Sequence, residues 1–154
     1  MPVTTLLAQQ LDALLTDEHD NIANLANASA LLKQILPDLN WAGFYLYHAD
    51  ADELRLGPFQ GNVACVHIKN GRGVCGTALA TKQSQRIDNV HEFADHIACD
   101  SQSNSELVVP LIKNNQVVGV IDLDSPTLAR FTEQDQRDLE AVAEVMVAHL
   151  DTTV

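Results

Sequence analysis

The chain opens with two stretches whose apolar residues recur at helical spacing. Residues 5–16 predict a first helix with an apolar stripe of Leu6, Leu7, Leu11, Leu14 and Leu15. A second helix is predicted at residues 21–36, and Pro37 directly beyond them is expected to end it. Its apolar face is expected to consist of Ile22, Leu25, Leu32, Ile35 and Leu36.

Aromatic and β-branched residues then predict a series of strands. Residues 41–47 form the first, and shorter strands are expected at 54–58 and 63–68, separated by Gly57, Pro58 and Gly61. Residues 73–81 suit a short helix. Residues 88–105 have no periodicity and predict a long loop, and a loop of that length inside a compact domain is most often functional.

A hairpin and a closing helix complete the pattern. Strands are predicted at 107–112 and 117–123, joined through Asn114 and Asn115, because asparagine tolerates the positive φ of a tight turn. A last helix begins near Thr132, a good N-cap residue, and is expected to bury Leu139, Val142, Ala143, Met146 and Leu150. This order predicts an α+β fold, a central antiparallel sheet with N-terminal helices and a C-terminal helix packed on it.

Length, composition and charge narrow the class of protein. The 154 residues are enough for one domain, 1–154, and 46% hydrophobic residues are ordinary for a globular protein. No basic leader and no run of about 20 apolar residues is present, so we expect a cytoplasmic protein without a membrane anchor. The net charge of −12 disfavours nucleic acid and anionic membrane surfaces as partners.

All three cysteines, Cys65, Cys75 and Cys99, lie in one central window among polar residues and glycines. Cytoplasmic thiols are kept reduced, so we expect this set to be catalytic or metal-bound rather than permanently bridged. Cys99 lies in the long loop and is the first candidate nucleophile, since an accessible thiolate is the reactive form. His96 is near enough in sequence to promote its ionisation, whereas the adjacent Asp100 opposes it.

Two carboxylates share one face of the last predicted strand. Period-two alternation places Val118, Val120, Asp122 and Asp124 on the same side. Paired acids beside an apolar stripe can bind an ammonium group or hold a proton for transfer. A solvated strand end before the turn at Ser125 explains them equally well.

Glu106 is a third acid and opens the preceding strand. With Asn114 and Asn115 at the tip of the hairpin, strict alternation places Glu106 opposite Leu123 and away from the paired acids. Joining them would require a bulge or a loop of odd length, and Pro110 within the strand favours a bulge.

Aromatic residues and glycines supply two further candidates. Trp41 and Tyr45 are four residues apart on one strand and face the same way, so they either wall a pocket or belong to the core. The glycines of residues 71–76 match a dinucleotide-binding spacing only weakly. Backbone amides at the start of the helix at 73–81 could still bind a small carboxylate.

A zinc site is the main competing interpretation of the thiols. The available ligands are Cys65, His67, Cys75, His91, His96 and Cys99. No C-x₂-C pair is present, however, and the spacing matches no common zinc module. Redox chemistry is therefore favoured over metal binding.

Several short motifs surround these candidates. Among them are Asn40-Trp-Ala-Gly-Phe-Tyr45, Gly71-Arg-Gly-Val-Cys-Gly76, His96-Ile-Ala-Cys-Asp-Ser101, Ser105-Glu-Leu-Val-Val-Pro110 and Gly119-Val-Ile-Asp-Leu-Asp-Ser125. Over residues 40–135 the chain resembles the free methionine-(R)-sulfoxide reductases, a family built on a single GAF domain. Generic GAF domains lack this cysteine set and the three acids. Departures are conservative, such as Asn89 where the family often has aspartate.

The resemblance implies a GAF-type fold and a thiol-based reduction of free L-methionine (R)-S-oxide, with no cofactor and no metal. Cys99 would attack the sulfoxide sulfur and become a sulfenic acid. Cys65 would be its disulfide partner, and Cys75 would resolve or relay. A thioredoxin-type dithiol would then reduce the enzyme.

The resemblance also assigns the acids and the aromatic residues. Glu106, Asp122 and Asp124 would hold the substrate's ammonium group and protonate the sulfoxide oxygen, and Trp41 and Tyr45 would line the pocket. It therefore predicts a bulge or loop that brings Glu106 to the other acids. A homodimer is a further expectation of the family.

Two other functions stay open on the residues alone. One is a GAF module that senses a nucleotide, tetrapyrrole or amino acid, although an acid-lined pocket disfavours any phosphate ligand. The other is a zinc- or redox-regulated structural protein, which stoichiometric zinc in the reduced protein would support.

Overall fold

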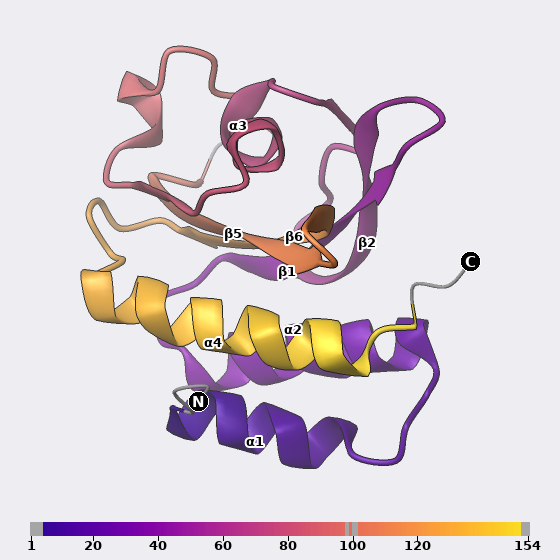
Figure 1. The fold of residues 1–154 in the computed structure, drawn as a ribbon. Coiled ribbons are helices and arrows are strands. Elements are labelled where there is room, and N and C mark those ends of the chain that lie inside the picture. Colours follow the sequence, from indigo (N-terminus) through magenta and orange to yellow (C-terminus); the bar gives the residue numbers. More distant parts are fainter. Residues whose placement is uncertain (1–4, 98, 100–101, 152–154) are drawn as a thin grey trace.

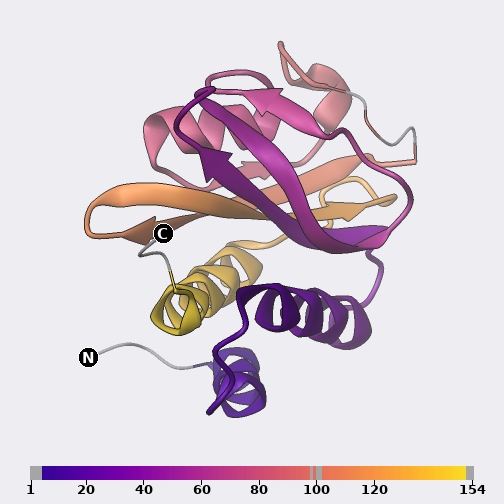
Figure 2. The same ribbon diagram turned by 90° about the vertical axis from the view of Figure 1, so that its right-hand side faces the viewer.

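The computed structural model has three layers, shown in Figure 1, and describes residues 5–97, 99 and 102–151. Helices α2 (Asn21–Ile35) and α4 (Glu133–His149) cover one face of a sheet, and α1 (Leu6–Leu15) packs against them. Helix α3 (Gly73–Thr81) lies on the opposite face, as Figure 2 shows from the side. Asp100, expected to oppose ionisation of Cys99, lies outside the described residues.

The sheet has six antiparallel strands in the order β3-β2-β1-β6-β5-β4. The strands are β1 (Trp41–His48), β2 (Glu53–Gly61), β3 (His67–Lys69), β4 (Gln85–Ile87), β5 (Ser105–Lys113) and β6 (Gln116–Ser125). The prediction of an α+β fold around an antiparallel sheet is confirmed. None of the described helices has both the length and the apolar character that a membrane span requires.

The helices begin where the sequence supplies caps. Thr5 Oγ1 accepts a hydrogen bond from the Ala8 amide at 3.2 Å, which satisfies a free donor at the start of α1. Thr132 and Asp135 form a reciprocal capping box before α4. The Asn114–Asn115 turn has φ of 53° and 66°, so the predicted hairpin and its tip are confirmed.

Some residues predicted to face the core are exposed. Leu7, Leu11 and Leu15 are buried, whereas Leu6 is 70% and Leu14 is 45% exposed. Each exposed leucine directly precedes a buried one and is rotated from it by about 100° around the helix. Ile22 and Ile35 are also exposed, because they lie in the first and last turns of α2.

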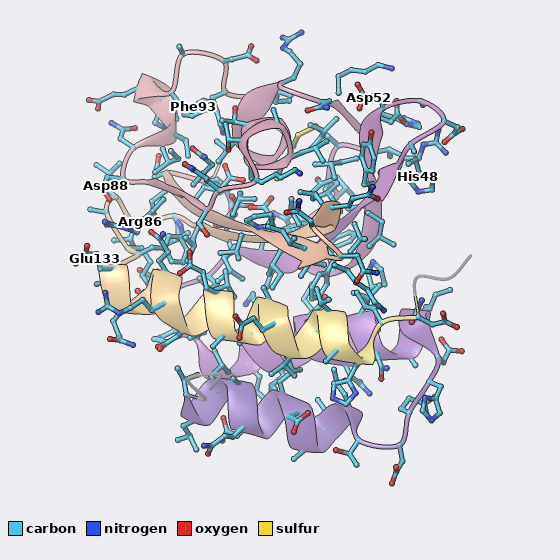
Figure 3. All side chains as sticks on the ribbon, viewed as in Figure 1. His48, Asp52, Arg86, Asp88, Phe93 and Glu133 are labelled. Atoms are coloured by element: carbon cyan, nitrogen blue, oxygen red, sulfur yellow. A yellow bond between two sulfur atoms is a disulfide. The ribbon has the colours of Figure 1, made fainter. Side chains whose placement is uncertain are left out.

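The weakest sequence signals gave the wrong strand limits. β2 continues through Gly57 and Pro58 to Gly61, and residues 63–66 belong to a loop rather than to a strand. β4 was not expected. Its Arg86 donates to Gln136 Oε1 at 3.3 Å and to the Phe131 carbonyl at 3.4 Å, which ties the edge strand to the start of α4 (Figure 3). The loop expected at 88–105 contains a short 3₁₀ helix at Val90–Glu92.

A bulge in β6 decides which residues share a face. Ile112 pairs with Val117 and Leu111 pairs with Gly119, so Val118 is the extra residue. Val118 packs on the helical side of the sheet, and its predicted place beside Val120 is therefore wrong.

The same bulge shifts every pair beyond it by one residue. Glu106 consequently lies opposite Asp124. The family resemblance predicted that Glu106 joins the other acids, whereas strict alternation had placed it opposite Leu123. Pro110 is regularly paired with Val120, so the bulge lies in β6 and not at the proline.

Candidate active site

A pocket opens on the face of the sheet that carries α3. The predicted site residues that line it are Trp41, Tyr45, Cys75, Cys99, Glu106, Asp122 and Asp124. Strands β1, β3, β5 and β6, helix α3, the loop between β2 and β3 and the loop after β4 all contribute lining residues. Cys65, the eighth predicted residue, is not among the lining residues but is bonded to one of them.

A disulfide joins Cys65 to Cys99, with the two Cα atoms 5.4 Å apart. It links the short loop between β2 and β3 to the long loop before β5. Cys75, on the first turn of α3, is a free and buried thiol. The three cysteines of the central window are therefore gathered around one pocket, and two of them are joined as a disulfide.

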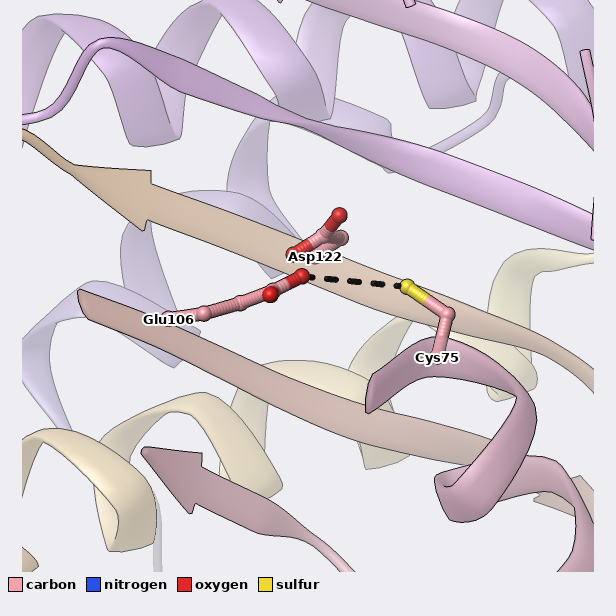
Figure 4. Close-up of side chains that lie close together, drawn as sticks. All are labelled: Cys75, Glu106 and Asp122. Carbon is pink, nitrogen blue, oxygen red and sulfur yellow. Dashed lines mark hydrogen bonds between the residues drawn. The ribbon is translucent and has the colours of Figure 1, made fainter. Parts of the chain in front are cut away.

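Two buried carboxyl groups that line the pocket lie close together, as Figure 4 shows. The residues Glu106 and Asp122 are only 6% and 5% exposed. Burial, and then repulsion from Asp122 and Asp124, raises the pKa of Glu106 well above its usual value. Burial also raises the pKa of Asp122. This pair of carboxyl groups is thus able to retain a proton at neutral pH.

Asp122 has an acceptor that no described residue satisfies. Its Oδ1 atom is fully buried and makes no hydrogen bond to the described part of the chain. A buried acceptor without a partner is costly, which makes it a natural contact for a bound donor such as an ammonium group.

The free thiol of Cys75 lies against the same acids. Its Sγ atom is 4.0 Å from Glu106 Oε2, the contact dashed in Figure 4. Burial, followed by the charges of Asp122 and Glu106, raises the pKa of the Cys75 thiol well above its usual value. Cys75 therefore remains a protonated, poorly nucleophilic thiol in this oxidised state.

Stacked aromatic rings form one wall of the pocket. The rings of Trp41 and Tyr45 are stacked with centroids 5.8 Å apart, and Phe59 stacks on Trp41 at 5.0 Å. Trp41 Nε1 donates to the Asn62 carbonyl at 3.1 Å, and the Tyr45 hydroxyl donates to the Cys65 carbonyl at 3.2 Å. Burial raises the pKa of Tyr45, so this donor stays protonated. Both aromatic residues thus shape the pocket and hold the loop that carries Cys65.

His96 reaches the pocket from the long loop. Its Nε2 atom lies 4.0 Å from Glu106 Oε1, and burial, followed by the nearby His91, lowers its pKa. A neutral imidazole at this place can exchange protons with the buried acid. Its predicted influence on the ionisation of Cys99 concerns the reduced protein and stays a prediction.

The start of α3 does bind a carboxylate, and that carboxylate belongs to the chain itself. The Gly73 amide donates to Asp95 Oδ2 at 3.1 Å, and Arg72 Nε donates to the same oxygen at 2.7 Å. Gly73 has φ of +63°, which favours glycine at this position. Arg72 and Asp95 thereby fix the long loop to the helix that carries Cys75.

The proposed zinc ligands are not brought together. Cys65 and Cys99 bond each other, His67 contacts Glu53, and His91 bonds Asn104. Among the described residues, Cys75, Glu106 and Asp122 are the one group of potential ligands close enough to surround an ion. This set differs from the one that the sequence suggested.

Sequence reasoning missed two residues that complete the site. Phe59 supports Trp41, and Asn62 supplies the carbonyl that orients the indole. Their one sequence signal was proximity, since both lie in the uncharged stretch just before Cys65.

Comparisons with known proteins identify the family of this chain and agree with its fold. The GAF domain model matches residues 10–150. The free methionine-R-sulfoxide reductase of Escherichia coli (strain K12) is 52% identical over 147 residues, covering 96% of this chain and 88% of that protein.

Two solved structures share the fold over nearly the whole chain. The structure of fRMsr of Staphylococcus aureus in its reduced form has a TM-score of 0.89 at 48% identity, covering 94% of this chain and 92% of that one. The X-ray structure of free methionine-R-sulfoxide reductase from Neisseria meningitidis in complex with its substrate has a TM-score of 0.91 at 39% identity, with coverages of 97% and 95%.

Proposed function

This chain belongs to the GAF-domain family of free methionine-(R)-sulfoxide reductases, and we propose that it reduces free L-methionine (R)-S-oxide to L-methionine. The observation that supports this most is the Cys65–Cys99 disulfide beside a pocket lined by buried acids. A thiol pair supplies the two electrons, and the acids supply a proton and a counter-charge for an amino acid.

Cys99 is the nucleophile in this proposal. Its thiolate attacks the sulfur of the protonated sulfoxide, the oxygen passes from that sulfur to Cys99, and methionine leaves, so that Cys99 is oxidised to a sulfenic acid. The Cys65 thiol then displaces that oxygen as water and forms the disulfide. A thioredoxin-type dithiol reduces the disulfide and is itself oxidised, which returns both thiols for the next cycle.

The acids have two roles. A sulfoxide sulfur becomes electrophilic enough for attack by a thiolate when its oxygen is protonated, and Glu106 holds a proton because burial raises its pKa. Asp122 and Asp124 hold the substrate's ammonium group. The unsatisfied Asp122 Oδ1 accepts a hydrogen bond from it. A methionine sulfoxide within a peptide has no such group, so the free amino acid is preferred.

A stereospecific assay tests the proposal. Free (R)- and (S)-sulfoxides are each supplied with thioredoxin, beside a peptide-bound substrate, to the wild type and to Cys99→Ser. We expect turnover of the free (R)-sulfoxide alone and none by the variant. Activity only on the peptide, or an active Cys99→Ser enzyme, would overturn the proposal.

The cycle requires a compartment that maintains reduced dithiols, and we place it in the cytoplasm. The homodimer expected from the family stays a prediction, which sedimentation analysis can test.

A further inference from the structure

The β2–β3 loop, residues 62–66, exposes aliphatic side chains around the disulfide. Val63 is 86% and Val66 is 53% exposed, and they flank Cys65 at two positions and one position away. The whole stretch 56–66 carries no charged residue, in a chain with 30 residues of Lys, Arg, Asp and Glu (9 basic plus 21 acidic). This loop is therefore an uncharged and partly apolar surface.

The loop backbone is held in place by its carbonyl groups. Trp41 Nε1 binds the Asn62 carbonyl at 3.1 Å, the Tyr45 hydroxyl binds the Cys65 carbonyl at 3.2 Å, and the Leu56 amide binds the Val66 carbonyl at 2.9 Å. With these three carbonyls anchored inward, the valines stay exposed to solvent at fixed positions. Such a preformed apolar surface loses little entropy when a partner covers it.

The two sulfurs of the disulfide belong to different surroundings. Cys99 lines the substrate pocket with the aromatic residues and the acids, whereas Cys65 does not line it. Thiol–disulfide exchange requires the attacking thiolate to approach along the S–S bond, from the far side of the sulfur it attacks. An attack on Cys99 would require a partner to enter the pocket, whereas Cys65 lies between Ala64, which lines the pocket, and Val66, which does not.

We propose that the β2–β3 loop is the docking surface for the protein dithiol, and that the dithiol attacks Cys65 Sγ. The first partner thiolate forms a mixed disulfide with Cys65, and Cys99 leaves as a thiolate beside the empty pocket. The second partner thiol attacks the mixed disulfide, so the partner becomes oxidised and Cys65 is released. This inference rests on the proposed cycle and adds the site and the direction of its last step.

Val66 is suited to test the surface because it does not line the pocket. Val66→Asp and Val66→Lys both replace the aliphatic side chain but change the charge in opposite directions. Ile22→Asp is the matched control, since Ile22 is 73% exposed on α2, on the other side of the sheet (Figure 1). The oxidised proteins are reduced either by thioredoxin or by dithiothreitol, and the rate of disulfide reduction is measured.

Both Val66 variants should lower the rate constant with thioredoxin by about tenfold, a loss typical of a central interface residue. Their rates with dithiothreitol, and all rates of Ile22→Asp, should stay within about twofold of wild type. An unchanged thioredoxin rate, an effect of only one charge, or an equal loss with both reductants would overturn the docking surface. Failure of thioredoxin to reduce even the wild type would instead contradict the reductant in the proposed function, and the docking with it.

A trapping experiment tests the direction of attack. A thioredoxin that lacks its second active-site cysteine is mixed with the oxidised wild-type protein, and the stable mixed disulfide is mapped by peptide mass spectrometry. The partner should be bonded to Cys65. A mixed disulfide on Cys99 would overturn the proposed attack, whereas reduction of the wild type by intact thioredoxin would leave the proposed cycle standing.

Discussion

Glu106 lies directly opposite Asp124 across the β5–β6 ladder. The pairing depends on one extra residue, Val118, which displaces the register of β6 by one position. Asp122, two residues before Asp124, points to the same face and completes the acid cluster. The raised pKa of Glu106, and with it the proposed proton donor, thus depends on a local irregularity of one strand.

Replacement of Glu106 by glutamine should remove the proton donor while keeping the size of the side chain. We expect kcat to fall by about 10²–10⁴-fold, the usual contribution of a general acid. Because the pKa of Glu106 is raised, its protonated form persists below that pKa and is lost as pH rises through it. The wild-type pH profile should therefore have an alkaline limb that Glu106→Gln lacks, and a shared limb would contradict this role.

Asp122→Asn should stabilise the protein at neutral pH while weakening substrate binding. The folded-state pKa of Asp122 is raised, so the native state holds a proton that the unfolded chain releases above about pH 4. Stability is thus lost as pH rises from there through the folded pKa.

In urea unfolding, the variant should be more stable than wild type at pH 8 and almost equal to it at pH 4. The m-value should not change, since the surface exposed on unfolding is the same. A gain of equal size at both pH values would show that the burial of charge is not its cause.

Trp41 is the single tryptophan of the chain and lines the pocket, so its fluorescence reports on binding there. Free methionine sulfoxide should change the emission in a saturable titration. N-acetylmethionine sulfoxide, which lacks the ammonium group, should bind at least about tenfold more weakly, because a buried charge partner is lost. Equal affinity for the two compounds would mean that the acids do not hold the ammonium group.

Cys65 and Cys75 should behave differently when each is replaced by serine. Cys65→Ser should stall after one turnover with a sulfenic acid on Cys99, detected as a dimedone adduct by mass spectrometry. Cys75→Ser should still form the Cys65–Cys99 disulfide and release methionine. A dimedone adduct in Cys75→Ser but not in Cys65→Ser would reverse the two assignments.

The helices and the hairpin could be predicted because their signals are local. Thr132 and Asp135 cap α4 through their own side chains. Asn114 and Asn115 form the turn because asparagine tolerates the positive φ that the turn requires. The strands β3 and β4 have three residues each, which is too short for a periodic pattern.

The acid cluster could not be assembled from periodicity. Strict alternation places Glu106 opposite Leu123, and nothing in the identity of Val118 marks it as the extra residue of a bulge. The Cys65–Cys99 pairing depends on contact between two distant loops and was expected from the family resemblance alone. The loop carbonyls that hold Asn62 and Cys65 depend likewise on tertiary contacts with Trp41 and Tyr45.

A single turnover without any external reductant tests the central claim most directly. Fully reduced protein is mixed with excess free methionine (R)-sulfoxide, and methionine and protein disulfides are quantified together. We predict about one methionine per chain, formed together with the Cys65–Cys99 disulfide, since one dithiol supplies the electrons for one sulfoxide. Absence of methionine, or methionine formed while Cys65 and Cys99 stay reduced, would contradict the account.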